Sequence, residues 1–208
     1  MAPRPKNPPA DRRQEILNAA LQIFAQKGYN ATTNADIARE AGVTPAALYY
    51  YFASKEELFR AAVTDLRGQF QPAMALFEGE ELLEIPPAEL IPQVLRHVIG
   101  ILSEERNKAI LKIIIAEGPR DPSILAIWQE QMVSVIRPLF PYLIHHMQQG
   151  RIKPMDPRLF FLLLQGPLMA VVVTRDLLGL SLLQDITNEM LLDGLLGTTL
   201  RGLLIETE

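Results

Sequence analysis

Three consecutive tyrosines, Tyr49, Tyr50 and Tyr51, carry the most distinctive chemistry of this sequence, with Thr44 and Lys55 on either side. In a helix, successive side chains point 100° apart, so the three rings spread over more than half of the surface and cannot all be buried. Exposed phenol hydroxyls beside a threonine and a lysine suit contacts with a phosphate backbone and with groove edges. The alternative is a set of core tyrosines between stacked helices, and the triplet alone leaves the two interpretations about equal.

The sequence offers little for catalysis or metal binding. His97 lies in an apolar stretch, where a hydrogen-bonded core or pocket histidine is more common than a ligand. His145 and His146 are adjacent, so their side chains diverge on a helix and cannot share a metal as an i, i+4 pair does. There is no cysteine, Gly-rich phosphate loop, nucleophile elbow or paired-carboxylate motif. We therefore expect neither an enzyme nor a bound cofactor or metal.

The tyrosines need a helix to present them, and the flanking residues predict a short one. Thr44 is a good N-cap, and Pro45 fits the first turn, where its missing N–H costs nothing. Leu48 and Phe52 are four residues apart and can anchor one face inward. A helix of about two turns does not persist alone, so other elements must support it.

The preceding residues supply that support and decide between the two interpretations. Residues 32–43 predict a helix capped by Thr33, with Asp36 in its first turn and a left-handed stop at Gly42. The turn of three to four residues that follows has helix-turn-helix spacing. A first long helix over residues 11–27 has an apolar stripe that can pack behind the two short helices. Ser54 begins another helix with a capping box to Glu57. This arrangement favours DNA binding.

An ordered set of motifs over roughly residues 12–60 resembles the N-terminal domain of the TetR (tetracycline-repressor-like) family. The segments that carry the resemblance are Ile16–Phe24, Gly28–Thr33, Asp36–Ala38, Ala41–Val43, Leu48–Phe52 and Ser54–Leu58. The resemblance implies an all-α homodimer that represses transcription and releases DNA when a small molecule binds the C-terminal domain.

The resemblance also implies roles for individual residues at the DNA. Phosphate contacts would come from Thr33 and Asn34, contacts in or beside the major groove from Thr44, Pro45, Ala46, Ala47, Tyr49 and Tyr50, and backbone contacts from Tyr51 and Lys55. The two alanines depart from the family, because many members carry Gly and Ser or Thr there. Their methyl groups suit a thymine methyl but make no hydrogen bonds, so the base preference does not follow from the family.

Composition and charge set the domain organisation. The chain has 208 residues, 49% of them apolar and 21% charged, as in an ordinary globular protein. The net charge is −4, but residues 1–60 hold 8 Lys and Arg against 6 Asp and Glu, whereas the remainder holds 12 against 18. We expect a disordered basic tail at 1–10, which could alternatively lie in the minor groove. A helix-turn-helix domain follows at 11–58, in which residues 33–52 form the reader, the part that contacts DNA. The C-terminal domain comprises residues 59–208. About nine helices are expected in all.

The C-terminal domain is predicted to bind an effector and to dimerise. A long helix over 123–149 should be kinked at Pro138 and Pro141. The helix over 158–178 is apolar nearly all round, so with the helix over 187–204 we expect it to pair with its two-fold mate in a four-helix bundle. The predicted interface residues are Phe161, Leu164, Leu168, Val172, Leu191, Leu195 and Thr198. A hairpin buried within one chain is the alternative.

A pocket for the effector would be mostly apolar with a few polar groups. The candidates are Phe70, Met74, Phe77, His97, Trp128, Met132, Phe140, Gln165 and Met169. For any one of them, core packing is the more common explanation. Such a pocket suggests an apolar or aromatic effector.

The sequence therefore predicts a homodimeric repressor that binds a palindromic operator in double-stranded DNA. The alternatives are a transcriptional activator, and a ligand-binding or interaction module that binds DNA only non-specifically. Residues 1–10 contain four prolines and no apolar segment, unlike a signal peptide. The apolar run 159–174 is short for a membrane span and contains Gln165, Gly166 and Pro167. We expect a cytoplasmic, nucleoid-associated protein with no membrane partner.

Overall fold

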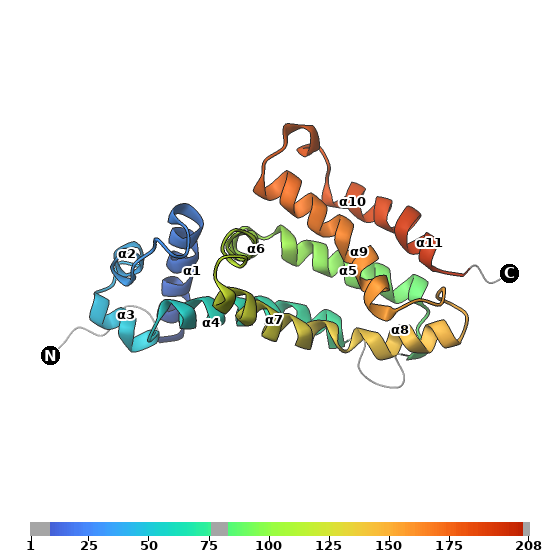
Figure 1. Ribbon diagram of the computed structural model, residues 1–208, viewed down its shortest axis with the longest axis horizontal. Helices are drawn as coiled ribbons and strands as arrows, with labels where there is room; N and C mark the ends of the chain where they lie inside the picture. Colours follow the sequence, from blue (N-terminus) through green and yellow to red (C-terminus); the bar gives the residue numbers. More distant parts are fainter. Residues whose placement is uncertain (1–8, 76–82, 206–208) are drawn as a thin grey trace. The chain divides into compact units, whose positions relative to one another are not determined.

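A computed structural model describes residues 9–75 and 83–205, and these residues form an all-α structure (Figure 1). Several helical segments follow one another without a break, and the described residues form ten helices besides the short 3-10 segment η4, against about nine expected. The β-type pairing seen among them is an isolated antiparallel bridge between Ile152 and Leu204. The predicted fold class is confirmed.

The contacts divide the chain into two compact units. Unit 1 comprises residues 1–66 and 105–131, and unit 2 comprises residues 67–104 and 132–208. Residues 105–131 therefore group with the helix-turn-helix, although the sequence alone placed them in the C-terminal domain. The physical reason is that α1 (Pro9–Lys27) packs against α6 (Glu105–Glu117) as well as against α2 (Asn34–Glu40).

Unit 1 further contains α3 (Pro45–Tyr51), the first part of α4 (Lys55–Met74) and the first part of α7 (Pro122–Ile136). The predicted caps form: Thr33 accepts from the amide of Asp36, and Thr44 accepts from the amide of Ala47. At the start of α4, the Glu57 amide donates to the Ser54 hydroxyl at 3.2 Å. Local sequence therefore sets where these short helices begin.

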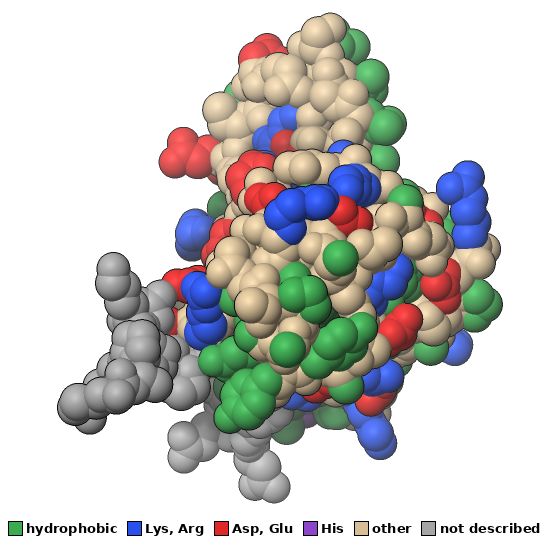
Figure 2. All heavy atoms as spheres, turned by 90° about the vertical axis from the view of Figure 1, so that its left-hand side faces the viewer, with side chains coloured by type: hydrophobic (Ala, Val, Ile, Leu, Met, Phe, Trp, Pro, Cys, Tyr) green, Lys and Arg blue, Asp and Glu red, His purple; other side chains and the backbone are tan. Residues whose placement is uncertain are grey.

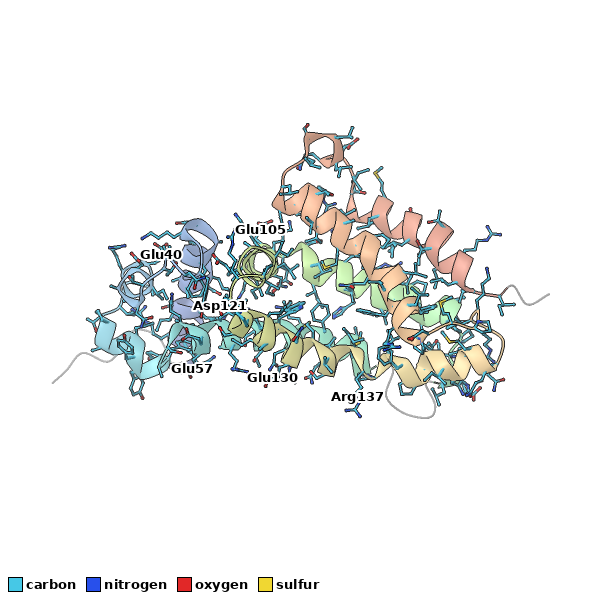
Figure 3. All side chains as sticks on the ribbon, in the orientation of Figure 1. Glu40, Glu57, Glu105, Asp121, Glu130 and Arg137 are labelled. Carbon is cyan, nitrogen blue, oxygen red and sulfur yellow. The ribbon has the colours of Figure 1, made fainter. Side chains whose placement is uncertain are left out.

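The core of unit 1 lies behind the helix-turn-helix. An aromatic cluster joins Phe24, Tyr29 and Phe59, with ring centroids 4.9 Å apart for the first pair and 5.7 Å for the second. Elsewhere in the unit, Glu130 of α7, which is labelled in Figure 3, forms an ion pair with Arg60 of α4. The apolar stripe predicted on the first helix is buried, since Ile16, Leu17, Ala20, Ile23 and Phe24 are at most 5% exposed.

Unit 2 contains α5 (Pro87–Ser103), α8 (Leu139–Gln148), α9 (Pro157–Val171) continued by η3 (Val172–Leu177), η4 (Ser181–Leu183), and α10 (Asn188–Gly194) continued by η5 (Leu195–Leu200) and α11 (Arg201–Leu203). The expected kinked helix over 123–149 is instead two helices, α7 and α8. Pro138 is the N-cap residue of α8 and Pro141 lies in its first turn, where a missing N–H breaks no bond within the helix.

The α9–η3 helix runs from Pro157 to Leu177 without interruption at Pro167. At 21 residues and a mean hydropathy of 1.6, it is long and apolar enough to cross a bilayer, so the expectation that this run is too short was wrong. Only 22% of its apolar stretch is buried. One such helix is weak evidence for a membrane span, and its inner side, with Phe160, Leu164 and Leu168, packs into the core of unit 2.

Candidate nucleic-acid interface

Helix α3 is anchored by its inner face and leaves its outer face open. Leu48 is 1% exposed and Phe52 is 2% exposed, so both side chains reach the core of unit 1. The guanidinium of Arg13 lies over the Phe52 ring, 4.6 Å from its centroid. The inward pair predicted from the four-residue spacing is confirmed, and it fixes which residues of α3 face outward.

The outward residues are the tyrosines and the first turn of α3. Tyr50 is 82% exposed and Tyr49 is 54% exposed, whereas Tyr51 is half-buried with its ring 5.1 Å from that of Tyr50. Pro45 and Ala46 are exposed beside them. Figure 2, which looks onto the left-hand end of Figure 1, shows hydrophobic side chains gathered in one area with Lys and Arg side chains around it. The three rings are thus not buried together, which excludes the core-tyrosine interpretation.

The turn before α3 is held by backbone and side-chain hydrogen bonds. Gly42 has a φ of +60°, which favours glycine, and the Val43 amide donates to the Ala38 carbonyl at 2.9 Å. The Arg12 guanidinium on α1 donates to the Gly42 carbonyl at 3.1 Å. This bond ties the turn to the supporting helix, so α3 is presented in one orientation.

An ionic network surrounds the start of α2. Asp36 accepts from Lys27 at 2.8 Å, from Arg39 at 2.5 Å and from the Thr33 hydroxyl at 2.8 Å. The hydrogen bonds from Lys27 and Thr33 hold the pKa of Asp36 well below its usual range. Because Asp36 partly neutralises these cations, the interface carries less free positive charge than its lysines and arginines suggest.

Lys55 is already engaged within unit 1. Its ammonium donates to the carbonyls of Tyr29, at 3.0 Å, and Thr32, at 2.8 Å, and lies 4.9 Å from the centroid of the Tyr29 ring. Burial raises the pKa of the Tyr29 hydroxyl far above its usual value, and the nearby Glu56 carboxylate raises it further. Lys55 therefore closes the loop between α1 and α2, and a phosphate would have to share it.

The structure places nine of the ten predicted DNA-contact residues in the α2–turn–α3 region and the tenth, Lys55, at the start of α4. Thr33, Thr44, Pro45, Ala46, Tyr49 and Tyr50 are exposed, and Asn34, Ala47, Tyr51 and Lys55 are half-buried. Sequence reasoning did not single out Arg39, whose side chain is 73% exposed on α2. The sequence signal that could have identified Arg39 is its position three residues after Asp36 on the same predicted helix.

Comparison with known proteins adds independent information. Residues 16–62 match the family described as bacterial regulatory proteins, tetR family. The chain therefore contains a tetR-family domain at residues 16–62. Its relatives include the transcriptional regulator AcrR of Shigella flexneri, 32% identical over 122 residues that cover 55% of this chain and 53% of AcrR. They also include the transcriptional repressor KstR2 of Mycolicibacterium smegmatis, 41% identical over 75 residues that cover 34% of this chain and 37% of KstR2.

The matches therefore span about half of AcrR and about a third of KstR2. Over the fold, this chain resembles the structure of a SmeT–triclosan complex with a TM-score of 0.75 and 21% identity, covering 94% of this chain and 93% of that one. The relatives are named as regulators and not as enzymes. Among the described residues, no group of three or more His, Asp or Glu side chains is placed to hold a metal ion.

The predicted effector residues of this chain do not gather at a described cavity. Phe77 lies outside the described residues, Phe70 and Met132 are buried, and the partly buried members are Met74, Trp128, Phe140, Gln165 and Met169. His97 is exposed, and its Nε2 lies 3.0 Å from the Gln69 carbonyl. His97 is thus hydrogen-bonded as expected but is not in the core, because the buried positions of α5 lie on its other faces.

Four of the seven predicted dimer residues are buried within the single chain. Leu164, Leu168, Val172 and Leu195 are at most 7% exposed in the single chain and face its own core. Phe161 and Leu191 are half-buried, and Thr198 is exposed. The apolar residues that α9 and its following loop leave open are Leu159, Leu162, Leu163, Leu178, Leu180 and Leu182. The exposed face of α9 is thus made of leucines that the prediction did not include.

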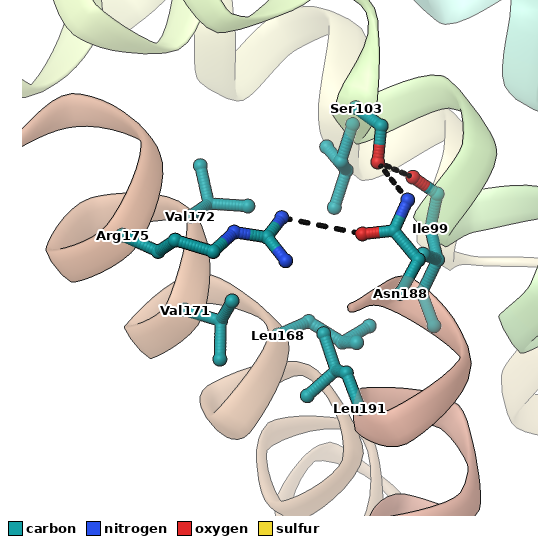
Figure 4. A pocket seen from close by; sticks show the side chains of 9 residues that line it. Ile99, Ser103, Leu168, Val171, Val172, Arg175, Asn188 and Leu191 are labelled. Atoms are coloured by element: carbon teal, nitrogen blue, oxygen red, sulfur yellow. Dashed lines mark hydrogen bonds between the residues drawn. The ribbon is translucent and has the colours of Figure 1, made fainter. Parts of the chain in front are cut away.

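In unit 2, a small cavity has Ser103, Arg175 and Asn188 in its wall, a polar cluster that sequence reasoning missed (Figure 4). Its volume of about 10 Å³ is room for roughly one water molecule. Arg175 donates to the Ile186 carbonyl at 2.6 Å and to Asn188 Oδ1 at 3.2 Å, and Asn188 Nδ2 donates to the Ser103 hydroxyl at 2.7 Å. Arg175 also pairs with Asp176 at 2.7 Å. These bonds join α5, η3 and the start of α10, which indicates a structural role.

Proposed function

We propose that this chain is a transcriptional repressor that binds a palindromic operator as a homodimer and is released by a small apolar or aromatic effector. The exposure of Tyr49 and Tyr50 on a helix anchored by Leu48 and Phe52 carries the proposal. A short, well-supported helix with an open outer face fits the major groove of B-DNA, as in other helix-turn-helix proteins.

The chemistry of the outer face suits both groove and backbone. Tyrosine hydroxyls form hydrogen bonds to phosphates or base edges, and the methyl group of Ala46 can contact a thymine methyl. Lys27 and Arg39 are both paired with Asp36, so they attract phosphates less strongly than free cations would. Shape complementarity and hydroxyl contacts should therefore contribute a larger share of the DNA affinity than in a strongly basic domain.

Dimerisation is proposed through the exposed face of α9. Leu162 is 58% exposed, Leu159 is 46% exposed and Leu163 is 40% exposed, and such a row of leucines on a helix of a water-soluble protein indicates a covered surface. The inner side of the same helix forms the core of unit 2, which favours a protein partner over a membrane. A two-fold dimer would place two α3 helices in successive major grooves, about 34–36 Å apart, and so require a palindrome.

The effector proposal rests on the bound triclosan in the SmeT complex and on the apolar character of the candidate residues. An effector that binds one conformation of the dimer better than the DNA-bound one shifts the population away from DNA. We place the protein in the cytoplasm, at the nucleoid. Activation in place of repression is compatible with the same DNA-binding geometry.

A selection of binding sites from random duplexes with the purified protein tests the proposal, followed by mobility shift on the selected site. We expect a palindrome, and a Kd weakened at least about fivefold by Tyr50→Ala, since a base-edge or phosphate contact contributes about 1–3 kcal/mol. Because Tyr50 is exposed, the free energy of unfolding of the same variant should lie within about 0.5 kcal/mol of the wild-type value. Ile115→Ala, which trims an exposed side chain on α6 of unit 1, is the matched control.

Two results would refute the proposal. One is equal affinity of wild type and Tyr50→Ala for the selected site. The other is binding that shows no sequence preference and falls steeply with salt, which would favour a ligand-binding or interaction module with only non-specific DNA contacts.

A further inference from the structure

A hydrogen bond between the two helices of the reader involves a residue that the family resemblance assigns to the phosphate backbone. Asn34 Nδ2, at the start of α2, donates to the hydroxyl oxygen of Tyr49 on α3 at 2.8 Å. The two residues are 15 apart in sequence. The bond therefore fixes the Tyr49 side chain against α2.

This bond also determines which hydrogen bonds the Tyr49 hydroxyl can still form. A phenol hydroxyl donates one hydrogen bond and can accept others, whereas an amide NH₂ only donates. Since Asn34 supplies a proton to the oxygen, the Tyr49 O–H must point elsewhere and remains free to donate. Accepting a hydrogen bond also polarises the O–H and makes it a stronger donor.

Tyr50 provides the contrast within the same helix. Its ring is 82% exposed and lies edge-on to Tyr51 at 5.1 Å, whereas Tyr49, at 54% exposure, is oriented by a hydrogen bond from another helix. Orienting a side chain before binding removes part of the entropy cost of immobilising it at the interface.

We propose that Asn34 is a positioning residue that acts through Tyr49 and makes it a dedicated hydrogen-bond donor toward DNA. Tyr49 then selects acceptors: a phosphate oxygen, or guanine O6 or N7, adenine N7 or thymine O4 on a base edge. It disfavours the amino groups of cytosine and adenine at the same position, because two donors would face each other. The inference rests on the proposed function, since it needs a DNA site to read.

A double-mutant cycle on the selected duplex tests the coupling, with Asn34→Ala, Tyr49→Phe and the double variant. We expect Tyr49→Phe to weaken binding about tenfold, Asn34→Ala to weaken it less or equally, and the double variant to bind as Tyr49→Phe does. Additive losses would overturn the inference, because Asn34 would then contact DNA on its own. Unchanged affinity of Tyr49→Phe would overturn it as well.

Asn34→Asp separates positioning from a merely structural role. A carboxylate at the first position of α2 favours the helix, but it accepts the Tyr49 proton and so removes the donor. Asn34→Asp should therefore weaken binding more than Ala35→Asp, which adds the same charge at the neighbouring exposed position. In a Tyr49→Phe background the two aspartate variants should become equal. An equal effect in the wild-type background would count against the inference.

Modified duplexes identify the acceptor. Replacing single phosphates by methylphosphonate, single purines by 7-deazapurine, single guanines by 2-aminopurine (which lacks O6) or single thymines by 5-methyl-2-pyrimidinone (which lacks O4) should abolish the difference between wild type and Tyr49→Phe at one position only. A methylphosphonate effect assigns a phosphate oxygen, and a 7-deazapurine effect assigns a base N7. If wild-type protein selects no site at all, the proposed function itself fails, which is distinct from a cycle that closes additively on a genuine site.

Discussion

Lowering the pH from 7 to 4 should destabilise this protein by about 3 kcal/mol through one buried side chain, His146. The imidazole is 0% exposed at the end of α8, packed edge-on against Tyr142 with ring centroids 4.4 Å apart. Burial lowers its pKa to about 4, and the positive charge of Arg151, whose Nη1 lies 3.4 Å from Nδ1, acts in the same direction. The Ile85 carbonyl and the Glu84 carboxylate oppose this shift more weakly.

The direction and size follow from the two pKa values. In the unfolded chain the imidazole takes up a proton below about pH 6.5, while in the folded chain it stays neutral until about pH 4. Between these values the unfolded state binds more protons, so stability is complete above pH 6.5 and falls as the pH drops toward 4. A difference of about 2.5 pKa units corresponds to about 3 kcal/mol.

The assay is urea denaturation at a series of pH values for wild type and for His146→Gln, which cannot titrate. Other acids also titrate in this range, so the informative quantity is the difference between the two proteins as a function of pH. We expect that difference to change by about 3 kcal/mol between pH 7 and pH 4. His145→Gln, which removes the neighbouring half-buried histidine, should follow the wild-type curve apart from a small loss of repulsion on His146.

Parallel curves for wild type and His146→Gln would show that His146 is protonated in the folded protein or reaches water. NMR titration of the imidazole resonances gives the same answer without denaturant. A His146 midpoint near 6.5 would refute the reasoning.

Further predictions concern the support of the reader and the exposed face of α9. Lys55→Met keeps the aliphatic stem but leaves two loop carbonyls without their donor, so it should lower the free energy of unfolding by about 1–3 kcal/mol in urea denaturation. Lys112→Met, at an exposed site on α6, is the control, and an equal effect of both would contradict the role given to Lys55. Leu162→Glu should convert the dimer to a monomer in sedimentation, at an unchanged melting temperature of the monomer. Val133 is 62% exposed on α7 in the single chain, and the control variant Val133→Glu should remain a dimer. A dimer that persists in Leu162→Glu would remove α9 as the proposed interface.

The sequence by itself determined the helix-turn-helix. Capping residues such as Thr33 and Thr44 bond within three residues, and the left-handed turn at Gly42 is set by its own backbone. The inward pair Leu48 and Phe52 follows from helical periodicity. Each of these features depends on neighbours a few positions away, so local reasoning suffices for them.

Tertiary structure decided the features for which local patterns carry no information. The α9 segment is apolar on nearly every side, so periodicity could not tell that Leu164 and Leu168 face inward while Leu162 faces out. The adjacent His145 and His146 are chemically identical, yet only one is fully buried. The choice in each case depends on which distant helix lies alongside, because burial is a property of the packed chain and not of a residue's neighbours in sequence.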